Sequence, residues 1–340
     1  MKGFDPFVPQ KPSIVLVESG EWTAFLIYKF QRENPSGYKR KKENQTMALR
    51  AVKPEVVVTP KPKFLLSGRS GVGKTMFSLD FPRPYYMDVE GGAVRPQYRK
   101  KLVEVGGVYF GKEQGADDFG AVLDEIKTLA TTKHEYKTLI IDSFSHLYLR
   151  AAALAEEKIG NEFGRDKKEA NRPTRQLMRW IGEVDMTVLL VCHSKDKWER
   201  RGRDIINTGS TFDGYDKLEF DMDLWLEATK MGNTRTLVVR KSRIESFPEG
   251  KEFPLDYKEF ATLYGKETIE KDSQPVEMAT SELAKKLRDL LDVVKIEQDT
   301  VDYWLKKANA EKFEDMKLTQ INGCIALCEK KLADLTKVVK

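Results

Sequence analysis

The chain has 340 residues, of which 40% are hydrophobic and 33% are charged. This is ordinary globular composition, and it excludes a chain that is disordered throughout. The net charge of +5, from 58 basic and 53 acidic residues, is too small to identify a polyanionic partner. Only local clusters of charge can carry that argument.

The sequence indicates neither a membrane segment nor secretion. It contains no run of 18 apolar residues, and its first residues lack the apolar stretch of a signal peptide. Three cysteines are an odd and sparse set, which suits a reducing compartment better than a disulfide framework. We therefore expect a cytoplasmic protein in which Cys324 and Cys328 pack within a helix and hold no zinc.

Residues 1–62 are rich in proline and predict a small β-rich extension. Two β-prone runs, 13–17 and 23–30, flank a turn at Gly20. A basic loop with one aromatic residue follows at 37–42. This loop fits a solvated surface as well as it fits a nucleic-acid contact.

From residue 63 to 265, short apolar runs alternate with polar helical stretches, a pattern typical of a parallel sheet with crossover helices. The expected strands are 64–67, 84–87, 138–141, 187–192, 224–228 and 235–239. We therefore predict an α/β core with a mainly parallel sheet. A polar linker is expected at 266–279, followed by a three-helix bundle over 280–340 that begins at the capping residue Thr280.

The stretch from residue 68 to 75 fits the phosphate-binding loop pattern in full, between an expected strand and an expected helix. Its residues are Gly68, Arg69, Ser70, Gly71, Val72, Gly73, Lys74 and Thr75. The glycines let backbone N–H groups point at phosphate oxygens. Lys74 would reach the β- and γ-phosphates of ATP, and Thr75 would bind Mg²⁺. Asp142, at the end of the strand 138–141, is the second expected magnesium residue.

Two further segments, 85–90 and 96–102, resemble the part of RecA that follows the phosphate loop. The resemblance implies that Glu90 is the catalytic carboxylate, which activates the attacking water from outside the metal shell. It also implies that Tyr98 stacks on adenine. One extra residue separates Tyr98 from Glu90, and a core aromatic fits the position equally well.

Two later segments extend the resemblance. His193 follows the strand 187–192 where RecA has a glutamine that senses the γ-phosphate, and a plain hydrogen bond at a strand end is the alternative. Lys241 and Arg243 resemble a basic pair that enters a neighbouring subunit's nucleotide site and stabilises the transferred phosphoryl group. The alternative for this pair is an exposed charged strand end. The resemblance to RecA implies a homo-oligomer in which ATP hydrolysis depends on assembly.

The resemblance covers residues from about 64 to 255, with the motifs in the family's order. It implies a RecA-like P-loop ATPase that uses ATP and Mg²⁺. The chain is most similar to the RecA-like and KaiC-like ATPases that phages encode for recombination and single-strand annealing. Residues 1–60 do not match the helix by which RecA joins its neighbour, which argues against a filament and leaves a ring or a small oligomer as the expectation.

A basic segment directly after His193 surrounds a single tryptophan with cations. The candidate DNA-binding residues are Lys195, Lys197, Trp198, Arg200, Arg201 and Arg203. Cations neutralise phosphates and tryptophan stacks on bases, which are the two main contributions to single-strand binding. We expect this segment and the tail 207–211 to form a flexible DNA-binding loop, assisted by a second basic loop at 164–175.

The sequence thus predicts a DNA-stimulated ATPase that binds single-stranded DNA as a homo-oligomer and acts in recombination or annealing. A hexameric DnaB-like helicase motor is the close alternative. A nucleotide-gated protein that binds no DNA, and that contacts a protein partner through its C-terminal bundle, is the alternative from another class.

Overall fold

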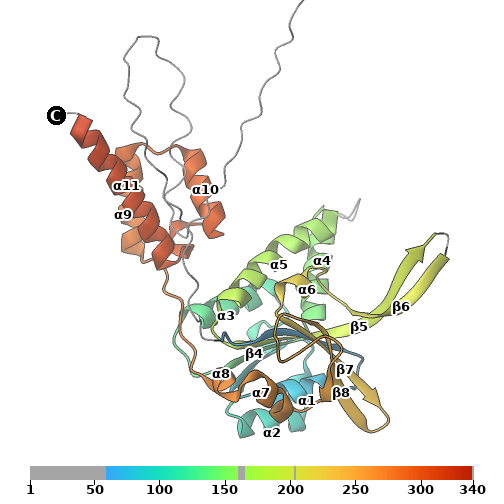
Figure 1. The fold of residues 1–340 in the computed structure, drawn as a ribbon. Coiled ribbons are helices and arrows are strands. Elements are labelled where there is room, and N and C mark those ends of the chain that lie inside the picture. The colour runs from blue at the N-terminus through green and yellow to red at the C-terminus, as the bar shows by residue number, and fades with distance from the viewer. Residues whose placement is uncertain (1–58, 160–164, 203, 339–340) are drawn as a thin grey trace, which may run out of the picture. The chain divides into compact units, whose positions relative to one another are not determined.

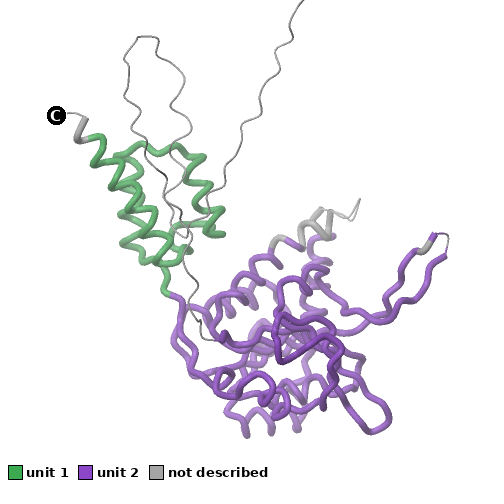
Figure 2. Tube along the Cα trace, viewed as in Figure 1, with its two compact units in different colours: residues 1–57, 277–340 green, residues 58–276 purple. Residues whose placement is uncertain are grey.

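The computed structural model describes residues 59–159, 165–202 and 204–338. The expected β-rich extension lies outside the described residues except for 59–62, and the basic loop at 37–42 lies outside them entirely. The described residues form two compact units, one that ends at residue 276 and one that begins at residue 277 (Figure 2). Each unit is described by itself below.

The larger unit is built on a mainly parallel sheet, as the sequence predicts. Its strands are β1 (Lys63–Gly68), β2 (Pro84–Asp88), β3 (Val108–Phe110), β4 (Thr138–Asp142), β5 (Thr187–Arg201), β6 (Asp204–Phe212), β7 (Leu224–Met231), β8 (Thr234–Ser242) and β9 (Glu252–Pro254). Their order is β3-β2-β4-β5-β1-β7-β8-β9, and β6 pairs with β5 outside that path. Strands β3 to β7 in this order are parallel, whereas β8 and β9 run antiparallel to their neighbours.

Helices cover both faces of this sheet (Figure 1). On one face lie α1 (Lys74–Leu79), α2 (Pro96–Glu104), α7 (Tyr257–Tyr264) and α8 (Lys266–Glu270), and on the other lie α3 (Phe119–Thr131), α4 (Phe144–Ile159), α5 (Arg165–Glu183) and α6 (Leu218–Asp221). Short 3-10 turns, η1 (Gly92–Val94) and η2 (Lys112–Gln114), flank α2 and β3. The two helical layers leave the central strands buried on both sides, which explains their unbroken apolar runs.

An aromatic cluster joins the first helical layer to the sheet. Phe260 of α7 stacks on Phe64 of β1 with ring centroids 4.9 Å apart. Phe81 packs edge-on against Phe77 of α1, with centroids 5.4 Å apart, and all four rings are almost fully buried. Burial of an aromatic side chain of this size contributes about 1.5–3 kcal/mol. The cluster fixes α1 against β1, and so positions the loop that connects them.

The prediction of a flexible loop after His193 is wrong, because this segment forms a long β-hairpin (Figure 1). Strand β5 continues to Arg201 and pairs with β6. Strand β6 includes residues 207–211, which were predicted to be a flexible tail. Cross-strand pairing of β-branched and aromatic side chains stabilises such a ribbon even when many of its residues are polar. Gly202, with φ 65°, supplies the left-handed backbone at the turn.

Two other expectations need correction, and two strands were missed. The expected second basic loop at 164–175 is helical, because α5 begins at Arg165. The expected linker at 266–279 starts with the short helix α8. The edge strands β3 and β9 were not predicted, since three residues are too short to give an apolar alternation.

The smaller unit contains the predicted helical bundle. Its helices are α9 (Ser281–Val294), α10 (Gln298–Ala308) and α11 (Leu318–Val338), with the 3-10 turn η4 (Phe313–Asp315) between the last two. The Thr280 side chain accepts from the Leu283 backbone N–H at 3.2 Å, so it caps α9 as expected. Cys324 and Cys328 are fully buried, and burial raises the pKa of Cys324 to about 12. Among the helices of the described residues, none is both long enough and apolar enough to cross a membrane.

Candidate nucleotide and nucleic-acid sites

The phosphate-binding loop lies between β1 and α1, at the carboxyl edge of the parallel strands. A Cβ atom on Gly68 would stand 2.7 Å from the Ala228 carbonyl oxygen, so β7 leaves no room there for a side chain. Gly73 has φ 108° and precedes α1 as its N-terminal cap. These two glycines therefore satisfy a close approach and a left-handed turn, the backbone requirements of a phosphate cradle.

Lys74 is folded back over this loop. Its Nζ donates to the carbonyl oxygens of Gly68, at 2.7 Å, and Arg69, at 3.1 Å, and the side chain is buried. Burial lowers the pKa of Lys74, while the charges of Asp142 and Glu90 raise it. A cation held at this place by two carbonyl oxygens can turn to a phosphate group without leaving the site.

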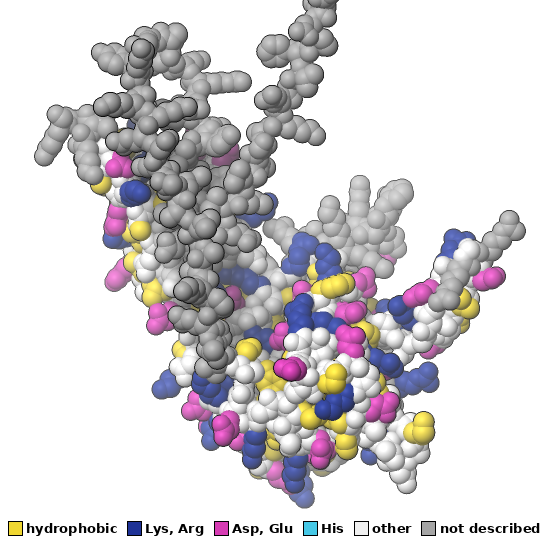
Figure 3. Space-filling view, viewed as in Figure 1, with side chains coloured by type: hydrophobic (Ala, Val, Ile, Leu, Met, Phe, Trp, Pro, Cys, Tyr) yellow, Lys and Arg dark blue, Asp and Glu magenta, His cyan; other side chains and the backbone are white. Residues whose placement is uncertain are grey.

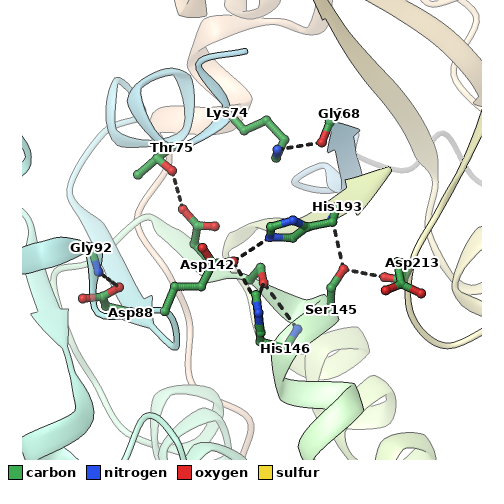
Figure 4. Close-up of polar contacts among 12 residues, drawn as sticks. Gly68, Lys74, Thr75, Asp88, Gly92, Asp142, Ser145, His146, His193 and Asp213 are labelled. Carbon is green, nitrogen blue, oxygen red and sulfur yellow. Dashed lines mark hydrogen bonds and ion pairs between the residues drawn. The ribbon is translucent and has the colours of Figure 1, made fainter. Parts of the chain in front are cut away.

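Thr75 and Asp142 form the expected metal pair. The Thr75 hydroxyl donates to Asp142 Oδ2 at 2.7 Å (Figure 4). Burial raises the pKa of Asp142 to about 6. The hydrogen bond from Thr75 lowers this pKa, and the negative charge of Glu90 raises it. The negative charge of this buried carboxylate and the acids beside it would be balanced by a divalent cation. Hydroxyl and carboxylate oxygens are also the ligands that Mg²⁺ prefers. The residues therefore fit a magnesium ion.

Glu90 stands between two imidazole rings. Its Oε1 lies 2.7 Å from His193 Nε2 and 3.0 Å from His146 Nδ1. Burial would raise the pKa of Glu90, but hydrogen bonds from Ser143 and His193 and the charges of both histidines outweigh it and lower the pKa overall. Glu90 is therefore a carboxylate at neutral pH, as a group that takes a proton from water must be.

The same three side chains are the one group of metal-type donors found among the described residues. Their ligand atoms all lie within 4.8 Å of one another. Two histidines and one glutamate form a donor set that zinc accepts. The hydrogen bonds of Glu90 to the two histidines account for these short distances.

Four residues near Glu90 were not singled out from the sequence. Both carboxylate oxygens of Asp88 accept backbone N–H groups, from Gly92 and Ala93, each at 2.7 Å, and this shapes the turn that carries Glu90. The others are Tyr86, Ser145 and His146. The available signals were the position of Asp88 at a strand end and that of His146 one helical turn beyond Asp142.

Tyr98 packs in the first helical layer and against the turn after Glu90. A Cβ atom on Gly92 would lie 3.4 Å from its ring, and the ring joins the core cluster that contains Tyr86. Arg95 stands 5.9 Å from the ring centroid. These contacts are those expected of an aromatic residue in the core. Stacking of Tyr98 on adenine stays a prediction.

His193 connects this site to the hairpin. It pairs in register with Gly68 of the phosphate loop, within the parallel contact of β5 and β1. Its backbone N–H donates to the Ser145 hydroxyl at 3.0 Å, and the same hydroxyl donates to the carbonyl of Asp213, directly after β6 (Figure 4). One strand therefore carries a residue that contacts Glu90 and, from the next residue onward, forms the hairpin.

The hairpin presents the candidate DNA-binding residues on an exposed ribbon. Basic, acidic and hydrophobic side chains occur together on it (Figure 3). Trp198 is 60% exposed and Ile205 is 67% exposed. Trp198 pairs with Asn207, and Arg200 pairs with Ile205, so these four share one face of the ribbon.

Several of the hairpin's cations already have partners. Lys195 Nζ lies 2.9 Å from Asp213 Oδ1, and Lys197 Nζ lies 3.0 Å from Glu199 Oε1. Asp196 lies 3.8 Å from Arg69 of the phosphate loop, which links the hairpin base to that loop. The side chain of Arg201 and the whole of Arg203 lie outside the described residues.

Lys241 and Arg243 lie at the opposite edge of the sheet from the phosphate loop. Ser242 pairs with Leu224, which pairs with Phe64 at the start of β1, whereas Gly68 ends that strand. Lys241 donates to the Met222 carbonyl, and Arg243 lies 3.9 Å from Asp223 and is half exposed. Neither is therefore positioned to serve the phosphate loop of its own chain.

A different cation of the same strand lies beside the loop. A Cβ atom on Gly73 would stand 3.4 Å from Arg235 Cδ and 3.3 Å from the Leu255 side chain. Arg235 lies near the start of β8, where it pairs with Lys230 in the carboxyl half of β7. Arg235 was not predicted from the sequence, because its position depends on the antiparallel direction of β8.

Comparison with known proteins identifies the domain. No curated protein matches the chain. Similar solved structures include the RadB recombinase, with 16% identity and a TM-score of 0.34 over 57% of this chain and 86% of that one. They also include a prototypical ATPase from the type III secretion system of pathogenic bacteria, with 10% identity and a TM-score of 0.34 over 79% and 81% of the two chains. Residues 60–244, more than half of the chain, match the model of the AAA domain family. The chain therefore belongs to the AAA domain family.

Proposed function

We propose that this protein couples ATP hydrolysis to the binding of single-stranded DNA, in recombination or strand annealing. The observation that carries the proposal is the course of β5. This strand passes the phosphate loop at Gly68, contacts Glu90 through His193 and then forms the exposed hairpin with Trp198. A change at the γ-phosphate therefore has a short and continuous route to the ribbon.

In the proposed reaction, Lys74 leaves the Gly68 and Arg69 carbonyl oxygens and binds the β- and γ-phosphates of ATP. Thr75 and Asp142 would hold Mg²⁺, which would neutralise charge on the phosphates. Glu90 accepts a proton from the attacking water, since it is ionised and lies outside the Thr75–Asp142 pair. His193 contacts Glu90 and would sense whether a γ-phosphate is present.

The proposed DNA site is the face of the hairpin that carries Trp198 and Arg200. An exposed indole offers a stacking surface to any base, and an adjacent guanidinium neutralises a phosphate. Lys195 and Lys197 would contribute less, because each already lies within 3.0 Å of a carboxylate.

We further propose that the protein is a homo-oligomer in which Lys241 and Arg243 act on a neighbour's nucleotide. Their place at the opposite edge of the sheet from Gly68 supports action in trans over action in cis. Mixing tests this. Arg243→Ala and Lys74→Ala subunits, each inactive alone, should regain part of the ATPase activity together, because an intact Arg243 then faces an intact loop. No recovery in oligomers shown to be mixed would contradict the proposal.

Steady-state ATPase activity with and without single-stranded oligonucleotide tests the function as a whole, with Lys74→Ala as the inactive control. We expect DNA to raise the rate and the protein to anneal complementary strands. Activity that ignores DNA, together with no DNA binding, would instead indicate a nucleotide-gated protein that contacts another protein. Unwinding of a forked duplex would indicate a helicase motor.

A further inference from the structure

The first turn of α4 holds a histidine for which the proposed reaction has no role yet. His146 Nδ1 lies 3.0 Å from Glu90 Oε1 and 2.8 Å from the Ser143 hydroxyl. His193 Nε2 reaches the same Glu90 oxygen at 2.7 Å. The two imidazole rings meet edge to face, with centroids 5.1 Å apart and planes at 88°. Two rings from different elements therefore converge on one carboxylate oxygen.

The protons of this cluster follow from the charge of Glu90. An ionised carboxylate can only accept hydrogen bonds, so both ring nitrogens that reach Oε1 must carry a proton. Donation from His146 to Glu90 therefore requires the tautomer that has Nδ1 protonated. The Ser143 hydroxyl accepts from the His146 backbone N–H at 3.3 Å and itself donates to Glu90, which leaves the imidazole proton for Glu90 as well.

The turn that carries His146 is itself held in place. Ser145, one residue earlier, is buried and joins the His193 backbone to the carbonyl of Asp213. Asp142, four residues earlier, is bonded to Thr75. The His146 side chain, by contrast, is 48% exposed, so the fold does not need it to fill a cavity. Because its backbone is fixed and its ring is exposed, the His146 side chain is suited to orient another group.

We propose that His146 is a positioning residue for Glu90: its Nδ1–H holds Oε1, and with His193 it fixes the rotation of the carboxylate toward the attacking water. The proposal rests on the proposed role of Glu90 in hydrolysis. Two donors on one oxygen restrict both the place and the direction of the carboxylate. Without His146, Oε1 keeps His193 as its one imidazole donor, so the carboxylate is held less firmly.

The test compares donor-less variants with one that keeps a donor. His146→Leu and His146→Ala remove the Nδ1–H, whereas the amide of His146→Asn reaches about the same place as Nδ1. We expect the donor-less variants to lose kcat for ATP by about 10- to 100-fold, since a displacement of about 1 Å at a reacting group costs on the order of 100-fold. KM for ATP should stay within about twofold, and His146→Asn should recover most of kcat. Thermal unfolding should change little in all three.

Three results would overturn the inference. Equal loss in His146→Asn and His146→Ala would show that the ring shape, and not the donor, matters. A rise in kcat without the donor would mean that His146 restrains Glu90. A rise in KM at unchanged kcat would assign His146 to nucleotide binding.

Glu90→Gln separates this inference from the proposed function. If Glu90→Gln hydrolyses ATP at the normal rate, the role of Glu90 is wrong, and the role of His146 is wrong with it. If Glu90→Gln is inactive while His146→Ala and His146→Leu turn over normally, only the inference about His146 is wrong.

Discussion

The two halves of β5 are built on different principles. Residues 187–192 lie between β4 and β1, and their side chains are buried on both faces. From Ser194 onward the strand pairs with β6, and from Lys195 onward its side chains are largely exposed. The first half is held by burial, and the second by backbone pairing and cross-strand contacts. We infer that the buried half sets the chemistry and that the exposed half can change its contacts without disturbing it.

The largest expected effect separates chemistry from DNA binding. Glu90→Gln should slow hydrolysis by about 100- to 10,000-fold, the range of a lost general base. Binding of magnesium and ATP should persist, because Glu90 lies outside the Thr75–Asp142 pair. Single-strand affinity with ATP bound should stay within about twofold of the wild type. Radiolabelled phosphate release and nucleotide titration measure the first two effects. A joint loss of binding and hydrolysis would make Glu90 structural.

Stability should differ between the halves almost as strongly. Leu189→Ala, in the buried half, should lower the free energy of unfolding by about 2–5 kcal/mol, because a cavity replaces side-chain atoms that are fully enclosed. Ile205→Ala, on the hairpin, should change it by less than about 0.5 kcal/mol, since that side chain is 67% exposed. Urea unfolding of the full chain compares the two. Equal effects would mean that the hairpin packs against another part of the folded protein.

A smaller effect should appear in DNA binding alone. Trp198→Ala should weaken single-strand binding by about 1–3 kcal/mol with little change in salt dependence, because stacking releases no counterions. Arg200→Ala is the matched control on the same face, and it should reduce the salt slope by about 0.7. Fluorescence anisotropy over a salt series distinguishes them. ATPase activity without DNA should be normal in both, and unchanged DNA affinity in both would place the DNA elsewhere.

The same contrast explains what the sequence could predict. Strands such as β4 and the first half of β5 are buried on both faces, so their apolar runs are visible locally. The phosphate loop is contiguous from Gly68 to Thr75 and needs no tertiary information to be found. Strand β6 is exposed along most of its length, with Asn207 and Gly209 among its residues, and so it resembled a flexible tail.

Contacts between distant segments were also hidden from the sequence. His146 and Glu90 are 56 residues apart, and His193 and Glu90 are 103 apart. Only the order of β2, β4 and β5 in the sheet brings their strand ends together. The position of Lys241 and Arg243 away from Gly68 likewise depends on the antiparallel direction of β8.

The central claim is that His193 transmits the state of the nucleotide to the hairpin. The most direct measurement is single-strand affinity of His193→Ala with ADP and with a non-hydrolysable ATP analogue, beside wild type and His193→Gln, whose amide keeps a donor near Nε2. In wild type we expect the two nucleotide states to differ by about 1–3 kcal/mol, the usual size of such coupling. His193→Ala should bind both nucleotides and lose this difference, and His193→Gln should retain part of it. An undiminished difference in His193→Ala would contradict the account.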